Sequence, residues 1–113
     1  MEIIKEKISI EKLKEIAKES FGDLVKAVVD VEKEIMVVGG ELHSDEEALL
    51  LENGSKQEDL WGINLYPERE FDDWIEFYSI INLRPAMGNR SCDIDDIEIK
   101  RKIYKIVNKL IER

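Results

Sequence analysis

The sequence contains very few of the residues that form disulfides and zinc sites. Cys92 is the only cysteine and His43 the only histidine among 113 residues. A single cysteine excludes an intramolecular disulfide and a cysteine-rich zinc site, and a single histidine leaves a zinc ion short of its usual nitrogen and sulfur ligands. We therefore expect no metal and no cofactor, and a reducing, cytoplasmic environment.

Segments that would place the chain in a membrane are also missing. The first sixteen residues, MEIIKEKISIEKLKEI, carry charges at short intervals and lack the apolar core of a signal peptide. No apolar run approaches the length of a membrane span. We expect a cytoplasmic protein that makes no contact with a membrane.

Basic residues are scarce relative to acidic ones. The chain has 17 Lys and Arg against 26 Asp and Glu, which gives a formal net charge of -9. Binding to nucleic acid or to an anionic lipid surface irrespective of sequence needs a basic face. The composition argues against both partners, although it leaves room for a local basic patch.

Motifs for nucleophilic catalysis and nucleotide binding are absent as well. No serine lies in a G-x-S-x-G setting, and the glycines form neither G-x-x-x-x-G-K-[ST] nor G-x-G-x-x-G. Cys92 lies among three nearby aspartates, a setting that disfavours a reactive thiolate. The sequence therefore gives no direct support for these chemistries.

What the chain does contain is enough apolar sequence for one core. A hydrophobic fraction of 43% and a charged fraction of 38% predict a single domain over residues 1–113. Apolar residues at helical spacing predict amphipathic helices over Ser9 to Ser20 and Ile94 to Ile111. Ser9 is the expected N-cap of the first helix, and aspartates open the last one.

The stretch Glu41 to Gly62 contains two consecutive helix-start signals. Ser44 with Glu47, and Ser55 with Glu58, each have the spacing of a capping box. Gly54 between them is expected to adopt the left-handed conformation that ends a helix. We predict a capped helix followed by a second short turn that leads into the strand at Leu60.

Strands are predicted from valine-rich and alternating segments. Leu24 to Val31 and Ile35 to Gly39 form one expected hairpin, and Leu60 to Tyr66 with Trp74 to Arg84 form a second. Met1 to Ile4 is a possible edge strand. The predicted fold is α+β, with a mainly antiparallel sheet of about four to five strands and helices packed on one face. The expected core residues are Trp61, Ile63, Phe77, Ile81, Ile103 and Leu110.

In this arrangement the second face of the sheet stays uncovered. Strand alternation places a polar and aromatic set on that face, which can serve as a platform for a ligand or partner but is also an ordinary composition for a half-exposed sheet. Its members are Asn64, Tyr66, Trp74, Glu76, Tyr78, Asn82 and Arg84.

The second hairpin would bring two polar segments together at one end of the sheet. Gln57 and Asp59 would approach Arg84, Asn89 and Arg90. This juxtaposition has two interpretations: a salt-bridged loop anchor, or a pocket in which Arg84 or Arg90 grips a small anion or carboxylate.

His43 invites a metal or acid/base interpretation because Asp45, Glu46 and Glu47 follow it closely. Acidic residues are favoured in a first helical turn by the helix dipole alone, and consecutive residues point in different directions around the axis. We predict a structural or hydrogen-bonding histidine and no tightly bound zinc.

The strings HSDEEALLLENGSKQEDLWGINLYP, INLRP and GNRS lie at His43 to Pro67, Ile81 to Pro85 and Gly88 to Ser91. Through them the chain resembles a family of small bacterial and archaeal proteins catalogued only as a domain of unknown function. The resemblance extends over nearly the full length. The resemblance implies that the chain has relatives in this family, but it implies no activity.

The functional hypothesis is a binding or interaction module that uses the exposed sheet face and the loop from Arg84 to Ser91. Its partner is a second copy of the chain, another protein or a small anionic ligand. The alternative is a small hydrolase or transferase acting on a polar anionic substrate, with Glu58 or Asp59 as general base and Arg84 as anion clamp. The candidate ligand-binding residues are Gln57, Asn64, Asn82, Arg84, Asn89 and Arg90.

Overall fold

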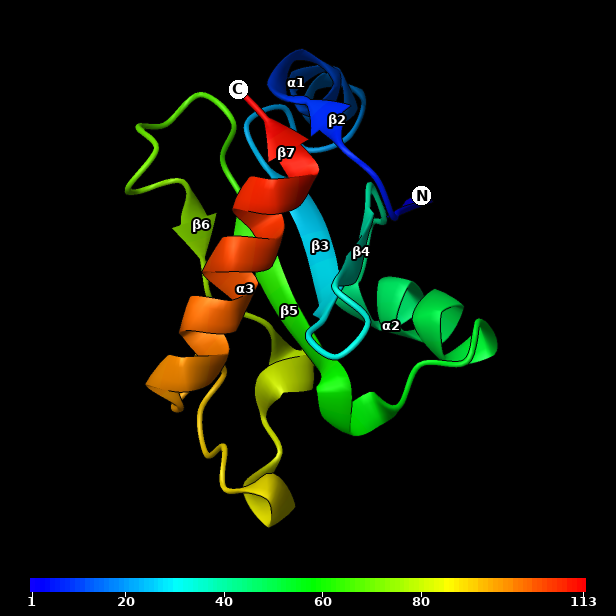
Figure 1. The fold of residues 1–113 in the computed structure, drawn as a ribbon, viewed down its shortest axis with the longest axis vertical. Coiled ribbons are helices and arrows are strands. Elements are labelled where there is room, and N and C mark those ends of the chain that lie inside the picture. The colour runs from blue at the N-terminus through cyan, green and yellow to red at the C-terminus, as the bar shows by residue number, and fades with distance from the viewer.

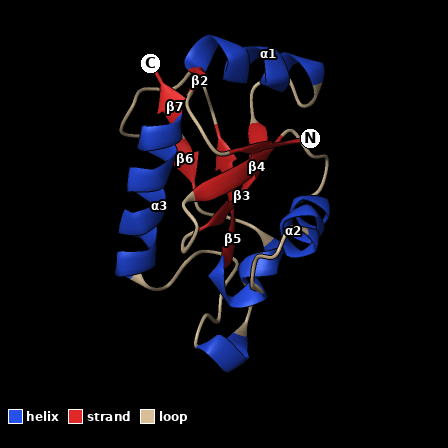
Figure 2. Ribbon diagram, turned by 45° about the vertical axis from the view of Figure 1, so that its right-hand side comes forward, coloured by secondary structure: helices blue, strands red, loops and turns tan.

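The computed structural model describes residues 1–113 and shows three α-helices around a five-stranded antiparallel sheet (Figures 1 and 2). The predicted α+β class is confirmed. The helices are α1 (Ile10–Glu19), α2 (His43–Glu52) and α3 (Ile97–Leu110). The sheet contains β1 (Glu2–Ile4), β3 (Val25–Asp30), β4 (Ile35–Val38), β5 (Leu60–Leu65) and β6 (Ile75–Glu76), while β2 (Ile8–Ser9) and β7 (Ile111–Glu112) form a separate parallel pair. Three short 3-10 turns are η1 (Gln57–Asp59), η2 (Ile80–Asn82) and η3 (Pro85–Met87).

The strands follow the order β1-β4-β3-β5-β6, so β3 is the central strand. It pairs with β4 as the predicted first hairpin and with β5 along its whole length, from Val25 opposite Leu65 to Asp30 opposite Leu60. The predicted edge strand at the start of the chain is β1, which pairs with β4. The first three sequence-predicted strands of the sheet are therefore correct to within a few residues.

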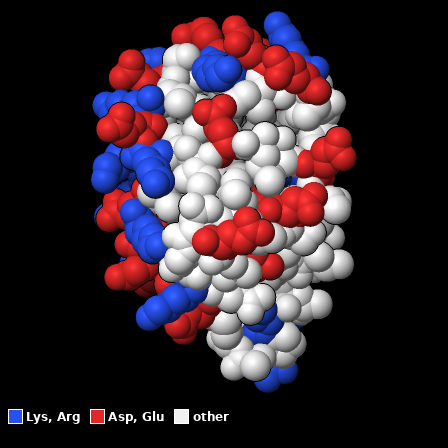
Figure 3. Space-filling view, turned by 90° about the vertical axis from the view of Figure 1, so that its right-hand side faces the viewer, with Lys and Arg blue, Asp and Glu red and all other residues white.

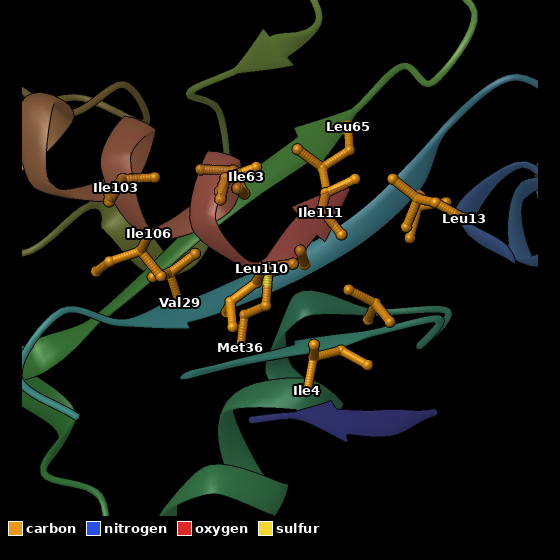
Figure 4. Packing of buried hydrophobic residues seen from close by; sticks show 14 of the residues in the cluster. Ile4, Leu13, Val29, Met36, Ile63, Leu65, Ile103, Ile106, Leu110 and Ile111 are labelled. Carbon is orange, nitrogen blue, oxygen red and sulfur yellow. The ribbon is translucent and has the colours of Figure 1, made fainter. Parts of the chain in front are cut away.

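The main core lies between this sheet and the helices α1 and α3 (Figure 4). Alternate residues of β3 and β5 face it, as Trp61 on β5 shows by its 5% exposure. The helices contribute their apolar stripes at helical spacing, which is why their positions were predictable. The stripe residues in this core are Ile10, Leu13 and Ala17 from α1 and Ile103, Ile106, Val107 and Leu110 from α3.

The opposite face of the sheet is covered by α2, contrary to the expectation of an open face. Val28, Val37, Leu50 and Leu60 form a second, smaller apolar cluster there. Figure 2 shows α2 and α3 on opposite sides of the sheet. Only Leu50 of the apolar run at positions 48–51 is fully buried. Because the buried stripe of α2 is this narrow, its sequence does not show which way the helix faces.

The predicted strand from Trp74 to Arg84 is wrong beyond Glu76. Two residues of β6 pair with β5, and the chain then leaves the ladder and passes through η2. The Ser79 hydroxyl caps η2 by accepting a hydrogen bond from the Ile81 amide at 3.3 Å. Trp74, which alternation placed on the open face, is 1% exposed and belongs to the main core. Alternation over eleven residues was therefore not a sign of one long strand.

The Asn82 side chain replaces the missing strand next to β5. Its Oδ1 accepts a hydrogen bond from the Gly62 amide at 2.8 Å, and its Nδ2 donates to the Gly62 carbonyl at 3.0 Å. A carboxamide has the same donor and acceptor pair as a peptide unit. One side chain thus continues the ladder where β6 has ended.

Gly62 is also a point of close approach, and this yields a first prediction. A Cβ built there would lie 2.5 Å from Ser79 Cβ and 2.6 Å from Ser79 Oγ. Overpacking of this kind costs roughly 1–3 kcal/mol, so we expect Gly62→Ala to lower the free energy of unfolding by about 2 kcal/mol. Urea unfolding followed by tryptophan fluorescence measures the loss. The double variant Gly62→Ala, Ser79→Gly should recover part of it, and purely additive losses would contradict a direct clash.

The expected capping box at Ser44 is not formed. The N-cap of α2 is Leu42, two residues before the expected Ser44, and it provides no side-chain hydrogen bond. The helix does end as predicted, because Gly54 has a φ of 93° and its amide donates to the Leu51 carbonyl at 3.2 Å. The start of α2 therefore keeps backbone amides without a side-chain cap.

The second expected box, at Ser55, is replaced by a tertiary contact. The Ser55 hydroxyl donates to Asp30 Oδ2 at 2.6 Å. The other oxygen of Asp30 accepts from the amides of Glu32 and Lys33 in the turn between β3 and β4. Ser55 thus links the end of the α2 region to the first hairpin instead of starting a helix.

Candidate functional site

A pocket remains on the α2 side of the sheet, between the first residues of α2 and the segment that follows β6. We call it the α2 pocket; its volume is about 260 Å³. It is the part of the predicted sheet face that α2 leaves open. Lys26 and Asn64 form its sheet wall, because they are directly opposite each other on β3 and β5. The complete lining is Lys26, Leu42, His43, Ser44, Asn64, Tyr78, Ser79, Ile80 and Ile81.

His43 is the first residue of α2 and is held against β5. Its Nε2 lies 2.7 Å from the Ile63 carbonyl oxygen, and since a carbonyl only accepts, Nε2 carries the proton in this hydrogen bond. Burial lowers the pKa of His43, with the nearby positive charge of Lys26 acting in the same direction and the bond to the Ile63 carbonyl opposing them. The ring is therefore neutral at pH 7 and has a lone pair on Nδ1, which makes no hydrogen bond within the protein.

Positive potential in the α2 pocket comes from two sources. Lys26 is half-buried, and its Nζ lies over the Phe21 ring at 5.3 Å from the centroid, with no carboxylate within 4 Å. The uncapped start of α2 adds the positive end of a ten-residue helix. In a chain with a net charge of -9, this pocket has a cation and no lining carboxylate.

Glu46 lies one turn into α2 and is fully buried. Its Oε2 accepts a hydrogen bond from the Gly40 amide at 3.0 Å, while its Oε1 has no partner. Burial raises the pKa of Glu46 from 4.5 to about 9, outweighing the Gly40 bond and the charge of Lys26. Glu46 is thus a neutral carboxylic acid at pH 7 and does not cancel the positive charge of Lys26.

The sequence contained a signal for this arrangement. His43, Glu46 and Leu50 occur at spacings of three and four and make up the buried face of α2. The helix dipole alone accounts for acidic residues in a first turn, so the sequence did not show that Glu46 points inward.

Asn64 lines the α2 pocket and has an unpaired acceptor with almost no exposed surface. It is 8% exposed, and its Nδ2 donates to Glu76 Oε1 at 2.8 Å and to the Tyr78 carbonyl at 3.3 Å. These bonds fix the orientation of the amide, and its buried Oδ1 has no partner. An unpaired buried acceptor is costly, so a donor that reached this oxygen after a small shift of the neighbouring side chains would be bound favourably.

Arg84 lies where the sequence placed it, beside Gln57, but its contacts are with backbone. One guanidinium nitrogen donates to the Gln57 carbonyl at 2.6 Å and another to the Leu60 carbonyl. The guanidinium also stacks over the Trp61 ring at 4.3 Å from the centroid. Burial lowers the pKa of Arg84, and the charge of Glu47 opposes that shift. These contacts favour the loop-anchor interpretation, with carbonyl oxygens in place of the expected carboxylates.

Asn89 holds the Arg84 to Ser91 loop together from inside. Its Nδ2 donates to the carbonyls of Asn82, Ser91 and Asp93 at 2.7–3.0 Å, and its Oδ1 accepts from the Asp95 amide at 2.7 Å. The Asp95 carboxylate accepts from the Ser91 hydroxyl and from the amide of Arg90, which together lower the pKa of Asp95. The loop is thus internally hydrogen-bonded.

Of the predicted ligand-binding residues, only Asn64 lies in the α2 pocket. Asn82 and Asn89 are buried and hydrogen-bonded to backbone, whereas Gln57 and Arg90 are exposed. The weak catalytic candidates Glu58 and Asp59 lie on η1, away from the α2 pocket lining. A ligand-binding or catalytic role for these residues stays a prediction.

No three His, Cys, Asp or Glu side chains come together as a possible metal site. None of the helices has both the length and the apolar character that crossing a membrane requires.

Comparison with known proteins gives a family match and nothing more specific. The family model described as "Protein of unknown function (DUF5674)" matches residues 2–110. No curated protein matches the chain, and no solved structure matches it.

Proposed function

We propose that this chain, which belongs to the DUF5674 family of proteins of unknown function, is a binding protein that takes a small anionic ligand in the α2 pocket. The observation that carries the proposal is the pairing of Lys26 and the uncapped start of α2 with a pocket lining that has no carboxylate. These groups attract a negative charge in a chain whose overall charge repels it.

The α2 pocket also selects for hydrogen-bond donors on the ligand. His43 Nδ1 is an acceptor without a partner in the protein, and Asn64 Oδ1 is a second one that a ligand reaches after a small shift of the side chains around it. Chloride and sulfate offer neither of them a donor, whereas a small carboxylate with a hydroxyl or amino group does. The volume of about 260 Å³ is below that of typical sites for drug-sized ligands. The ligand class is therefore a small hydroxy- or amino-carboxylate.

The exposed apolar rim of the α2 pocket supports the interaction role predicted from the sequence. Leu42, Tyr78 and Ile80 are 54%, 58% and 78% exposed around its mouth. A second copy of the chain or another protein that covers this rim would bury apolar surface and close the pocket over its ligand.

The enzyme alternative has less support. A hydrolase or transferase needs a nucleophile or an activated water beside its base. The α2 pocket has three hydroxyl-bearing residues, Ser44, Tyr78 and Ser79, and none of them is hydrogen-bonded to His43. Arg84, the proposed anion clamp, is bonded to backbone carbonyls outside the pocket. The α2 pocket therefore suits binding better than catalysis.

Titration of the 15N-labelled protein with malate and succinate tests the proposal. The two diacids have the same charge and length, but only malate has a hydroxyl donor. We expect amide shifts centred on His43, Ser44 and Asn64, tighter binding of malate than of succinate, and a loss of about tenfold or more in Lys26→Gln. Lys18→Gln, on the exposed side of α1, is the control for net charge. Equal affinities in the two variants, or no shifts in the α2 pocket with either diacid, would contradict the proposal.

A further inference from the structure

The C-terminal helix is a basic region in an otherwise acidic protein. Residues 97–113 contain six Lys and Arg but only two Glu, whereas the whole chain has a net charge of -9. Figure 3 shows most of the visible Lys and Arg atoms along the edge of the molecule where α3 lies, interspersed with Asp and Glu atoms, whereas the charged atoms on the face where α2 lies are mainly those of Asp and Glu. This is the local basic patch that the overall composition leaves room for.

An apolar groove runs along the outer side of α3. We call it the α3 groove; its volume is about 320 Å³. Its floor is apolar: Ile97 is 62% exposed, Tyr104 is 36% exposed, and Phe77 is half-buried beneath them against the main core. An isoleucine this exposed beside an aromatic ring is an apolar surface that a ligand can cover. The complete lining is Phe77, Ile97, Lys100, Arg101, Tyr104 and Lys105.

All charged residues that line the α3 groove are cations. Lys105 has no carboxylate within 4 Å. Lys100, which is half-buried, pairs with Asp93 at 3.1 Å. Arg101 pairs with Glu98 at 2.8 Å, but this pair is solvent-exposed on both sides and therefore weak. Lys100 Nζ also lies 5.4 Å from the Phe77 ring centroid, so positive charge reaches the floor itself. The α3 groove thus combines an apolar floor with a positively charged rim.

We propose that the α3 groove binds an amphipathic organic anion, with an aliphatic or aromatic body on Ile97, Tyr104 and Phe77 and a carboxylate, phosphate or sulfonate head at Lys105 and Arg101. Charge complementarity selects the anion, and the apolar floor selects a molecule with a hydrophobic body. A nucleic acid backbone would use the cations but leave the apolar floor uncovered. This site is separate from the α2 pocket, since α2 and α3 lie on opposite sides of the sheet (Figure 2).

Straight-chain fatty acids below their micellar concentrations are suitable probes. Titration of the 15N-labelled protein with hexanoate, octanoate and decanoate should shift the amides of Ile97, Tyr104 and Lys105, with affinity rising with chain length. Decanol, which has the same body without a charge, should bind more weakly than decanoate. Added salt should weaken the binding of decanoate and leave the binding of decanol nearly unchanged.

Matched variants separate the anion site from a general apolar patch. Lys105→Glu should lower the affinity for decanoate by about fivefold or more, because it reverses the charge at the rim of the groove. Lys102→Glu makes the same charge change on the same helix outside the groove and should have little effect. Ile97→Ser should weaken the binding of both decanoate and decanol. Equal losses in the two lysine variants, decanol binding as tightly as decanoate, or shifts confined to the α2 pocket would overturn the proposal.

Discussion

Replacing Glu46 by glutamine is expected to make the protein more stable at neutral and alkaline pH and to leave its stability near pH 5 almost unchanged. The Glu46 side chain is fully buried beneath α2, with one bond from the Gly40 amide and one oxygen without a partner. Glutamine keeps the acceptor for Gly40 and places its amide nitrogen where the acid already has no partner. The variant therefore removes the ionisation with little other change.

The direction of the stability change follows from the pKa values of Glu46 in the unfolded and folded protein. Burial raises the pKa of Glu46 from 4.5 to about 9, so the folded protein holds this proton more tightly than the unfolded chain does. The stability contributed by the neutral acid is complete below pH 4.5, falls as the unfolded chain ionises, and is lost as pH rises through about 9. At 1.36 kcal/mol per pH unit, the loss is on the order of 3 kcal/mol by pH 7 and roughly twice that by pH 9.

Urea unfolding of the wild type and of Glu46→Gln at unit steps from pH 5 to pH 9 measures this difference. The two free energies should be close at pH 5 and should diverge by about 3 kcal/mol at pH 7, with the variant more stable. Other titrating groups, including His43, act in both proteins and cancel in the comparison. Glu41→Gln, at an exposed position of the preceding turn, is the control. Parallel curves for wild type and Glu46→Gln would show that folding does not raise the pKa of Glu46 and would contradict the prediction.

The parts of the fold that sequence could predict are those in which one strong periodicity acts alone. The stripes of α1 and α3 and the alternation in β5 give the correct elements and faces, including a buried Trp61. The prediction of a strand that continues to Arg84 was wrong because the alternation persists after β6 has ended at Glu76. The Asn82 side chain takes over from the backbone of β6 at that point, and a side chain that replaces a strand leaves no periodic signal.

The candidate site was less predictable because it depends on which way α2 faces. Sequence analysis identified Asn64 as a polar residue on that side of the sheet and His43 as a hydrogen-bonding residue. The sequence did not bring them together, since the capping rule placed the N-cap of α2 at Ser44 instead of Leu42. Arg84 was correctly located beside Gln57, but spacing alone does not distinguish a guanidinium that grips carbonyls from one that is free for a ligand.

Truncation of Asn82 is expected to cause the largest loss of stability among single side chains outside the apolar core. Asn82 is fully buried, and its amide bonds to both the N–H and the C=O of Gly62 and to the Cys92 carbonyl at 3.1 Å. β6 pairs with β5 only at Asn64 and Leu65, so no strand can replace these bonds. Asn82→Ala therefore leaves polar backbone groups of a central strand buried and unpaired.

Each buried group left without a partner costs about 1–3 kcal/mol, so Asn82→Ala should lower the free energy of unfolding by roughly 3–5 kcal/mol. Urea unfolding at pH 7 measures the loss, and Asn53→Ala, which removes an exposed amide bonded to the Leu49 carbonyl, should cost far less. Asn82→Asp adds a second discriminating result. The ionised carboxylate still accepts from the Gly62 amide but opposes the carbonyls of Gly62 and Cys92, whereas the protonated acid can donate to one of them. That variant should therefore regain stability relative to wild type as pH falls below 5. A loss under about 1 kcal/mol in Asn82→Ala would mean that water enters and satisfies the exposed strand groups.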